Sequence, residues 1–466
     1  MPPIAEFIEN RTYDEIKVGD SAALTRTLRP EDIQLFAIMS GDVNPAHVDP
    51  EYAHSSMFHE VIAHGMWGAA LISTVLGTEF PGPGTIYIGQ TLKFSRPVKL
   101  GDTITIKITC KQKFDHNKHV LFDCLCINQD NLKVIAGEAE ILAPTEKIKR
   151  PRMELPEVTI SDRWGRYQRL LGRAKGLPSA TAAFGYPSHA ESLQSAAIAR
   201  DSGFMRPVLV GPEKQIRECA EQNKIDLKGC RFVDVTSAKA AVWRAIEMVR
   251  SGEAEILVQG GVATHEFLMP VVSPHGLRTE RRISHVLWID VPSYERPMII
   301  SDMMVNIEPT LEHKIEIVQN AIDFAHLMGV PDPKVAILAG IDTLTPKMRA
   351  TLDAAVLCKM ADRGQITGGV LDGPLGFDNA ISVVQARNAH LKSAVAGRAD
   401  VLIAPDLEAG NMLAKQLEHL GDAISGGVVM GGRAPIVLAN RNDSIESRVA
   451  SLVLSLLVAN QQRSQG

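Results

Sequence analysis

The chain has 466 residues, of which 45% are hydrophobic and 22% are charged, and its formal net charge is -5 at pH 7. This length exceeds what one hydrophobic core usually organises, so the sequence predicts at least two domains in an ordinary globular protein and excludes overall disorder. The slightly negative net charge gives no indication of a surface that binds nucleic acid or an anionic membrane. No uninterrupted apolar run is long enough to span a bilayer.

The first residues, Met1–Glu6, lack the basic region and apolar core of a secretory signal, so a cytoplasmic protein is expected. The six cysteines are scattered, and Cys124 and Cys126 alternate within a strand-like run. We expect reduced thiols, because no further ligands accompany this pair at the spacing of a zinc site.

In chain order, a short strand is expected over 21–28, followed by a helix that Pro30 begins and that carries Ile33, Phe36 and Ala37 at helical spacing. A second helix from about Gly65 to Gly77 is almost entirely apolar and should be buried. β-branched and alternating residues then predict strands over 85–94, 102–114, 119–128 and 132–142. The pattern is one buried helix followed by an antiparallel meander.

The first chemical motif is the turn that follows the first helix, Ser40-Gly41-Asp42-Val43-Asn44-Pro45-Ala46-His47. A bend at Asn44-Pro45 can bring the carboxylate of Asp42 and the imidazole of His47 onto one water molecule, which is the arrangement of a general acid/base pair. Turn chemistry alone would also select Gly, Asp, Asn and Pro here, so composition leaves both interpretations open.

Residues Phe36 to Asp49, together with Ala63-His64-Gly65-Met66, resemble the MaoC-like, (R)-specific enoyl-CoA hydratases. The resemblance implies an α+β hotdog domain over 1–145, an antiparallel sheet around a central helix, in which Asp42 and His47 are catalytic and Asn44 contacts substrate. Hydration also needs an oxyanion binder, and the backbone N–H of Gly65 at the helix start is our candidate. Close packing is a rival explanation for Gly65, and His64 is given no chemical role.

The composition changes after residue 145, where prolines alternate with charged residues. This segment, 146–162, is predicted to be a linker that holds neither strand nor helix. A basic helix is expected over Trp164–Leu171, with Arg163, Arg166, Arg169 and Arg173 on a solvated face.

From about residue 178 the pattern becomes strand, helix, strand, helix, which predicts a mostly parallel α/β sheet with ligands at the carboxyl ends of its strands. The expected strands cover 181–184, 207–210, 232–235, 256–259, 286–289, 298–301, 335–339, 369–371, 401–403 and 436–438. Their ends carry Gly260-Gly261, Asp302, Asp342, Asp372, Asp406 and a loop over 426–433. Gly-rich loops with Arg433 or Arg441 can bind phosphate, although such loops are often only tight connections.

A second resemblance runs in order through most of residues 180 to 460. The motifs Gly276-Leu277-Arg278-Thr279, Leu371-Asp372-Gly373-Pro374-Leu375 and Leu407-Glu408-Ala409-Gly410-Asn411 resemble phosphotransacetylases and phosphotransbutyrylases. The resemblance implies an α/β two-subdomain fold for 163–466 that exchanges an acyl group between coenzyme A and inorganic phosphate. The substrate contacts expected in this domain are Asp378, Asn411, Gly431 and Arg433.

The catalytic residues expected in this second domain are Asn440 and Arg441. Arg441 matches the family pattern, whereas Asn440 replaces the usual Ser and the following Asp443 is closer than in the family. Leu268-Met269-Pro270 also stands where relatives place a basic residue.

The sequence therefore predicts a bifunctional acyl-CoA enzyme, a hydratase joined to a phosphate acyltransferase. Its partners would be small-molecule acyl-CoA substrates, without nucleic acid or membrane, and it would need no metal or redox cofactor. Both resembling families form dimers, so a homodimer or higher homo-oligomer is expected. The alternative is a hydratase fused to a degenerate, non-catalytic domain that senses acyl-CoA or serves as a scaffold.

Overall fold

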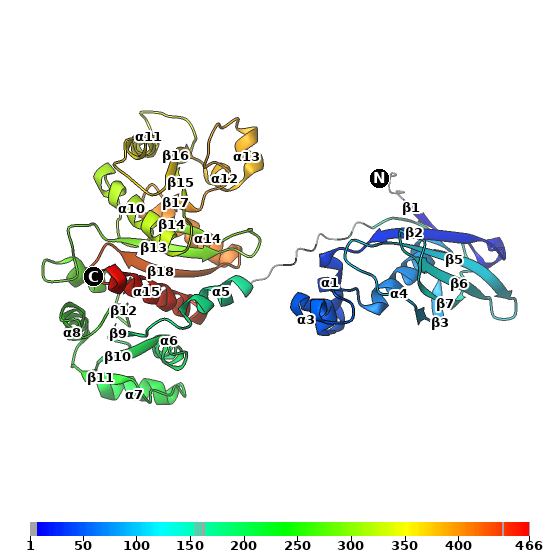
Figure 1. The fold of residues 1–466 in the computed structure, drawn as a ribbon, viewed down its shortest axis with the longest axis horizontal. Coiled ribbons are helices and arrows are strands. Elements are labelled where there is room, and N and C mark those ends of the chain that lie inside the picture. The colour runs from blue at the N-terminus through cyan, green and yellow to red at the C-terminus, as the bar shows by residue number, and fades with distance from the viewer. Residues whose placement is uncertain are drawn as a thin grey trace. The chain divides into compact units, whose positions relative to one another are not determined.

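The computed structural model describes residues 7–153, 155, 158, 160, 164–439 and 442–465. They form two compact units, Met1–Ile160 and Ser161–Gly466 (Figure 1). Among the helices of the described residues, none combines the length and the apolarity needed to cross a membrane. The six cysteines are free thiols, as predicted.

The first unit is built on an antiparallel sheet of order β2-β5-β6-β7-β3, with β4 also pairing with β7. The strands are β2 Ser21–Thr27, β3 Ile86–Gln90, β4 Lys93–Phe94, β5 Thr103–Phe114, β6 His119–Ile127 and β7 Lys133–Leu142. Alternate residues of β5, among them Ile104, Ile106 and Ile108, are buried because side chains on a strand alternate between its two faces.

The buried face of this sheet packs against α4, Gly65–Thr74, whose Trp67 and Ile72 belong to the same hydrophobic cluster as the β5 isoleucines. The chain continues from α4 as one π-helical segment, Val75–Glu79. The sheet around a helix is the predicted arrangement, but α4 is buried on one face only, since Met66, Ala70, Ser73 and Thr74 are exposed. The remaining helices are α1 Pro30–Ser40, α2 Pro45–Val48 and α3 Pro50–Ser55, with a 3-10 turn at Tyr13–Glu15.

The predicted linker is wrong over its first residues. Strand β8, Lys149–Pro151, pairs antiparallel with β1, Phe7–Glu9. Buried Asn10 donates two hydrogen bonds, to the carbonyls of Pro83 (3.0 Å) and Glu146 (2.8 Å), and accepts one from Ile148 N–H (2.9 Å). Residues 146–151 are therefore part of the first unit, because an edge strand tolerates proline and the alternating charges face solvent.

The second unit contains one sheet of order β11-β10-β9-β12-β19-β18-β13-β14-β17-β15-β16. Its strands are β9 Ala180–Gly185, β10 Met205–Gly211, β11 Arg231–Asp234, β12 Ile256–Gln259, β13 Ser284–Asp290, β14 Met298–Ser301, β15 Lys334–Leu338, β16 Val370–Leu375, β17 Val401–Ile403, β18 Ile424–Met430 and β19 Ile436–Val437. β13 pairs antiparallel with β14 and β18, and β18 pairs antiparallel with β19, whereas the other pairings are parallel.

The antiparallel pairs reverse the strand direction in the middle of the sheet. The carboxyl ends of β9 to β13 and β19 consequently lie at one edge, and those of β14 to β18 lie at the other. The loops at the carboxyl ends of the strands are therefore divided between two edges of the sheet.

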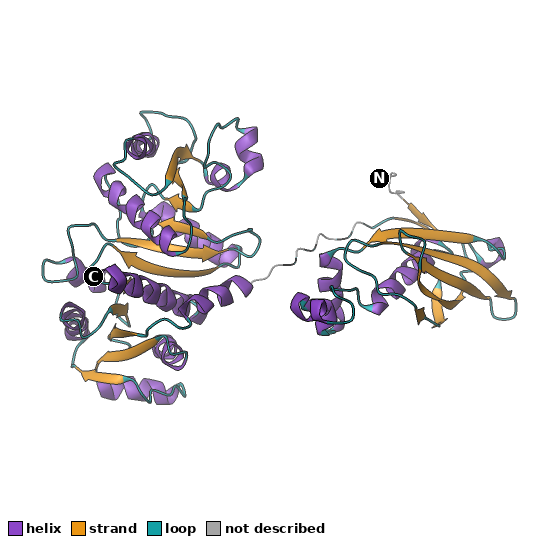
Figure 2. Cartoon of the chain, viewed as in Figure 1, coloured by secondary structure: helices purple, strands orange, loops and turns teal. Residues whose placement is uncertain are grey.

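Helices cover both faces of this sheet (Figure 2). They are α5 Gly165–Ala174, α6 Ala190–Asp201, α7 Glu213–Gln222, α8 Ala238–Arg250, α9 Thr264–Val272, α10 Leu311–Leu327, α11 Arg349–Asp362, α12 Phe377–Ile381, α13 Val383–Asn388, α14 Leu407–Leu420 and α15 Ile445–Gln465. The last of these, α15, packs along β18 (Figure 1).

Two expectations for this unit are wrong. Gly426 and Gly427 lie inside strand β18 and not in a loop. Glycine is needed within this strand because a Cβ at Gly426 would meet Ala450 of α15 and one at Gly427 would meet the His285 ring. Arg166 of α5 does not face solvent: its Nε pairs with buried Asp290 at 2.9 Å, and its guanidinium donates to the carbonyl of Tyr294 at 2.6 Å.

Candidate functional site

The turn between α1 and α2 has the local structure that its residue types predict. Gly41 ends α1 in the left-handed region, with φ 74°. Asp42 Oδ1 then accepts a hydrogen bond from Asn44 N–H (3.1 Å), and Asn44 Oδ1 accepts one from Ala46 N–H (3.1 Å), which caps α2. Capping accounts for the side-chain oxygen of Asn44, so this residue shapes the turn that presents Asp42 and His47.

His47 and Asp42 do come together, and His64 joins them. One potential ligand atom from each of these three side chains lies within 4.8 Å of the others. His47 Nδ1 lies 2.9 Å from the carbonyl oxygen of Ile62, so Nδ1 carries the proton of the neutral ring and Nε2 retains its lone pair. His47 is thus oriented with one nitrogen free to exchange a proton.

His64 has a clearer position than the sequence suggested. It is only 3% exposed, its Nε2 donates to the backbone carbonyl of Asp42 (3.0 Å), and its ring centroid lies 4.1 Å from that of His47. The side chain therefore fixes both members of the predicted pair. No sequence pattern indicated this contact, because His64 and Asp42 are distant in the sequence and only the fold brings them together.

His47 and His64 border a cavity of about 320 Å³. Its walls are largely apolar and include Phe58, Ile62, Phe94, Val98, Val134 and Ile135. Gly65 lies on the same cavity at the start of α4, and none of the described residues accepts a hydrogen bond from its N–H. A Cβ at Gly65 would lie 3.3 Å from the Phe94 ring, so close packing and an open N–H donor both favour glycine here.

In the second unit, the carboxyl ends of β12 and β19 are joined by Gln259, which the sequence analysis missed. Gln259 is 2% exposed. Its Nε2 donates to the carbonyl of Val262 (2.9 Å) and to Thr264 Oγ1 (3.3 Å), and its Oε1 accepts from Ala439 N–H (3.1 Å). Asn440 and Arg441 follow Ala439 directly in the sequence, but both lie outside the described residues.

At the other edge of the sheet, Asp302 follows β14 in a dense hydrogen-bond network. Its carboxylate accepts bonds from the N–H groups of Met304 (2.9 Å) and Val305 (3.1 Å) and from Asn306. Burial raises the pKa of Asp302, and the bonds it accepts oppose that rise. Asn306 in turn accepts from Arg282 Nε at 2.6 Å, so the network presents an arginine at a cavity of about 470 Å³.

The other predicted contacts of this domain are dispersed along that second edge. Asp378 is exposed at the start of α12, whereas its neighbour Asn379 donates to Asp342 at 2.7 Å. Asn411 donates to the carbonyl of Met303 at 3.4 Å, which braces the Asp302 loop. The structure therefore places Asp378 and Asn411 apart from Ala439.

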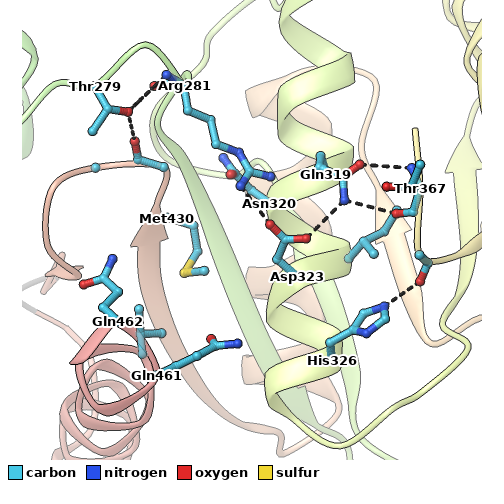
Figure 3. A pocket seen from close by; sticks show the side chains of 15 residues that line it. Thr279, Arg281, Gln319, Asn320, Asp323, His326, Thr367, Met430, Gln461 and Gln462 are labelled. Carbon is cyan, nitrogen blue, oxygen red and sulfur yellow. Dashed lines mark hydrogen bonds and ion pairs between the residues drawn. The ribbon is translucent and has the colours of Figure 1, made fainter. Parts of the chain in front are cut away.

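Gly431 and Arg433 lie in the turn between β18 and β19, at the amino end of β19 and so opposite Ala439. Gly431 accepts a hydrogen bond from Thr279 Oγ1 (2.7 Å) and lines a polar cavity of about 510 Å³. Figure 3 shows this cavity between α10 and the end of α15, with Arg281 paired to Asp323 across it. Arg433 is exposed, so the structure does not gather these two residues with the segment that leads to Arg441.

Comparison with known proteins assigns both units. Residues 236–456 match the family model described as phosphate acetyl/butaryl transferase, and residues 15–123 match the model described as MaoC like domain. A phosphate acetyltransferase of Rhizobium meliloti is 46% identical over 300 residues, covering 64% of this chain and 95% of the relative. A phosphate butyryltransferase of Clostridium beijerinckii is 36% identical over 294 residues, covering 63% of this chain and 97% of the relative.

The fold comparison agrees with the transferase match. The crystal structure of a branched-chain phosphotransacylase from Enterococcus faecalis V583 superposes with a TM-score of 0.54 at 28% identity, covering 60% of this chain and 99% of that chain. Both resemblances drawn from sequence motifs, and the fold classes they implied, are thereby confirmed.

Proposed function

Because the chain belongs to the phosphate acetyl/butyryltransferase family and also carries a MaoC-like domain, we propose that it is a bifunctional acyl-CoA enzyme. Its first domain hydrates trans-2-enoyl-CoA to (R)-3-hydroxyacyl-CoA. Its second converts acyl-CoA and phosphate into acyl phosphate and coenzyme A. The observation that carries the first activity is the Asp42, His47 and His64 cluster beside an apolar cavity, and the second rests on the 46% identity with a phosphate acetyltransferase.

In the proposed hydration, Asp42 and His47 Nε2 hold one water molecule between them. As its oxygen adds to the β-carbon, one of the pair takes a water proton and the other delivers a proton to the α-carbon. Negative charge accumulates meanwhile on the thioester oxygen, and we assign the N–H of Gly65 to stabilise it, which its place on the cavity at the amino end of α4 supports. Apolar walls suit the acyl chain and keep other water away.

In the proposed transfer, a phosphate oxygen attacks the thioester carbonyl carbon. A C–O bond forms, the C–S bond breaks, and the thiolate of coenzyme A leaves with the electron pair and then takes up a proton. We assign Arg441 to hold phosphate and Asn440 to donate a hydrogen bond to the carbonyl oxygen. The contact between Gln259 and Ala439 supports this assignment, since it fixes the backbone that leads into both residues.

We further propose that acyl-CoA and phosphate are substrates and that no metal or redox cofactor takes part in either step. A homodimer or larger homo-oligomer and a cytoplasmic location remain predictions from the sequence. Sedimentation of the purified full-length chain measures its assembly directly.

The transferase test is phosphate-dependent release of free thiol from acetyl-CoA and butyryl-CoA. We expect release by the wild type and its loss in Arg441→Ala, with crotonyl-CoA hydration unchanged. Arg433→Ala is the matched control, because Arg433 lies at the opposite end of β19. If thiol release is lost in Arg433→Ala and retained in Arg441→Ala, phosphate binds at Arg433 and not at Arg441. If the wild type hydrates crotonyl-CoA but releases no thiol, the protein is a hydratase fused to a non-catalytic domain.

The hydratase test is Asp42→Ala. We expect crotonyl-CoA hydration to fall by about 10²- to 10⁴-fold, the usual contribution of a general acid or base. Thermal stability should change little, because the side chain is exposed and its one turn hydrogen bond contributes only about 0.5 to 1.5 kcal/mol. A large drop in melting temperature with residual hydration would instead indicate that Asp42 only shapes the turn.

A further inference from the structure

A cavity of about 580 Å³ lies between α8 and α9 in the second unit, separate from the two cavities at the other edge of the sheet. Its wall is mainly apolar and includes Val242, Trp243, Val262, Met269 and Pro270. Lys239 and Glu266 are the charged residues among the described residues that line it. The volume falls within the range of about 300 to 1,000 Å³ that is usual for small-molecule sites.

The position of this cavity follows from strand direction. β11 and β12 belong to the parallel part of the sheet, so α8 and α9, which follow them, both begin at the edge where these strands end. Val262 lies in the loop between β12 and α9, and its carbonyl accepts the hydrogen bond from Gln259. The same Gln259 side chain accepts a hydrogen bond from Ala439 N–H, so one buried side chain links Val262 on the cavity wall to Ala439.

The residues that line this cavity favour an apolar ligand. Met269 is 70% exposed although it lies on a cavity wall, and an exposed, flexible thioether is adaptable to chains of different length. Trp243 and Val262 each pack partly against the hydrophobic cluster beneath, which leaves the rest of their apolar surface toward the cavity. Burying each additional methylene group contributes about 0.8 kcal/mol, or about fourfold in binding.

We propose that this cavity binds the acyl chain of the transferase substrate and admits linear acyl groups longer than four carbons. The inference rests on the proposed transferase activity and adds its substrate class. The thioester carbonyl would then lie on the side of Val262 that faces Gln259 and Ala439, while the chain extends between α8 and α9 past Val262 to Met269.

The kinetic test compares kcat/KM for octanoyl-CoA with kcat/KM for acetyl-CoA in the phosphate-dependent reaction of the full chain. Met269→Glu places a charge on the wall and should lower the octanoyl-to-acetyl ratio at least tenfold. Leu420→Glu makes a comparable exposed apolar-to-acidic change at the end of α14, where the residue is 86% exposed, and should leave the ratio unchanged. A ratio unaffected by Met269→Glu in an active enzyme overturns the proposal.

A binding test separates this inference from the proposed activity. Trp243 lines the cavity, so octanoyl-CoA should change a fluorescence signal that is present in the wild type and absent in Trp243→Phe. If no acyl-CoA is turned over but this signal responds to octanoyl-CoA, the transferase assignment fails and the acyl pocket stands. The cavity between α8 and α9 is not an acyl pocket if octanoyl-CoA leaves the Trp243 fluorescence unchanged. The same conclusion follows if Met269→Glu changes the sedimentation mass and leaves the octanoyl-to-acetyl ratio unchanged.

Discussion

Gln259 offers the sharpest test of how the second site is positioned. Replacement with Ala removes two donated hydrogen bonds and one accepted from Ala439 N–H, all made by a side chain that is 2% exposed. Each such bond contributes about 0.5 to 1.5 kcal/mol net, so Gln259→Ala, which removes all three, should lower the free energy of unfolding by about 1.5 to 4.5 kcal/mol. The loop after β12 and the segment after β19 would also lose their connection.

This loss of connection should appear in activity as well as in stability. A catalytic group displaced by about 1 Å can lose about 100-fold in rate, so we expect phosphate-dependent thiol release to fall by about 10- to 100-fold in Gln259→Ala. Hydration of crotonyl-CoA, measured on the same preparation, should not change. Gln259→Glu keeps an acceptor for Ala439 N–H and should retain part of the transferase activity.

Asn10 provides the control, because its side chain makes the same number of bonds in the first unit, two donated (both to carbonyls) and one accepted from a backbone N–H, at 1% exposure. Asn10→Ala should cost a similar free energy of unfolding yet leave thiol release intact at 25 °C. Transferase activity within twofold of wild type in Gln259→Ala, or equal loss of both activities, would refute the positioning role.

Three further predictions concern stability. Lys314 Nζ lies 2.8 Å from Asp353 Oδ2 in a buried pair, so Asp353→Asn should destabilise by about 3 to 5 kcal/mol in urea unfolding, and the added change Lys314→Met should restore much of it. Burial lowers the pKa of His285 to about 3, so the folded state keeps it neutral while the unfolded chain takes up a proton below about pH 6.5. Unfolding free energy should therefore fall by up to about 1.4 kcal/mol per pH unit between pH 6.5 and 3, and His285→Gln should flatten that slope. A Cβ at Gly137 would collide with the carbonyl oxygen of Thr91, so Gly137→Ala should lower the melting temperature and the hydration activity together while thiol release at 25 °C persists.

Sequence periodicity predicted most of the elements because it records which face is buried. The alternation of Ile104, Ile106 and Ile108 fixes both the strand and its inward face. The turn at Asp42 was also predictable, since Gly41 and Asn44 have local conformational roles that their residue types reveal.

Strand direction and long-range contacts have no such local signal. Gly426 and Gly427 suggested a loop, and only the approach of α15 and of His285 explains glycine inside β18. That misassignment also concealed the antiparallel centre of the sheet, and with it the separation of Gly431 from Ala439. Arg166 was expected in solvent because nothing near it in the sequence indicates its pairing with Asp290.

The two proposed sites depend on the same structural device. In each, a buried side chain from another element holds the backbone at or next to the residues assigned to the chemistry: His64 donates to the carbonyl of Asp42, and Gln259 accepts from the N–H of Ala439, which precedes Asn440 in the sequence. Such residues determine where a catalytic group lies without reacting themselves. Substituting such a residue therefore reduces the rate by displacing a catalytic group, and a conservative replacement that keeps its hydrogen bond should restore part of the rate. Substituting Asp42 or Arg441 instead removes the reacting or phosphate-binding group itself, so no change at the positioning residue can restore the rate.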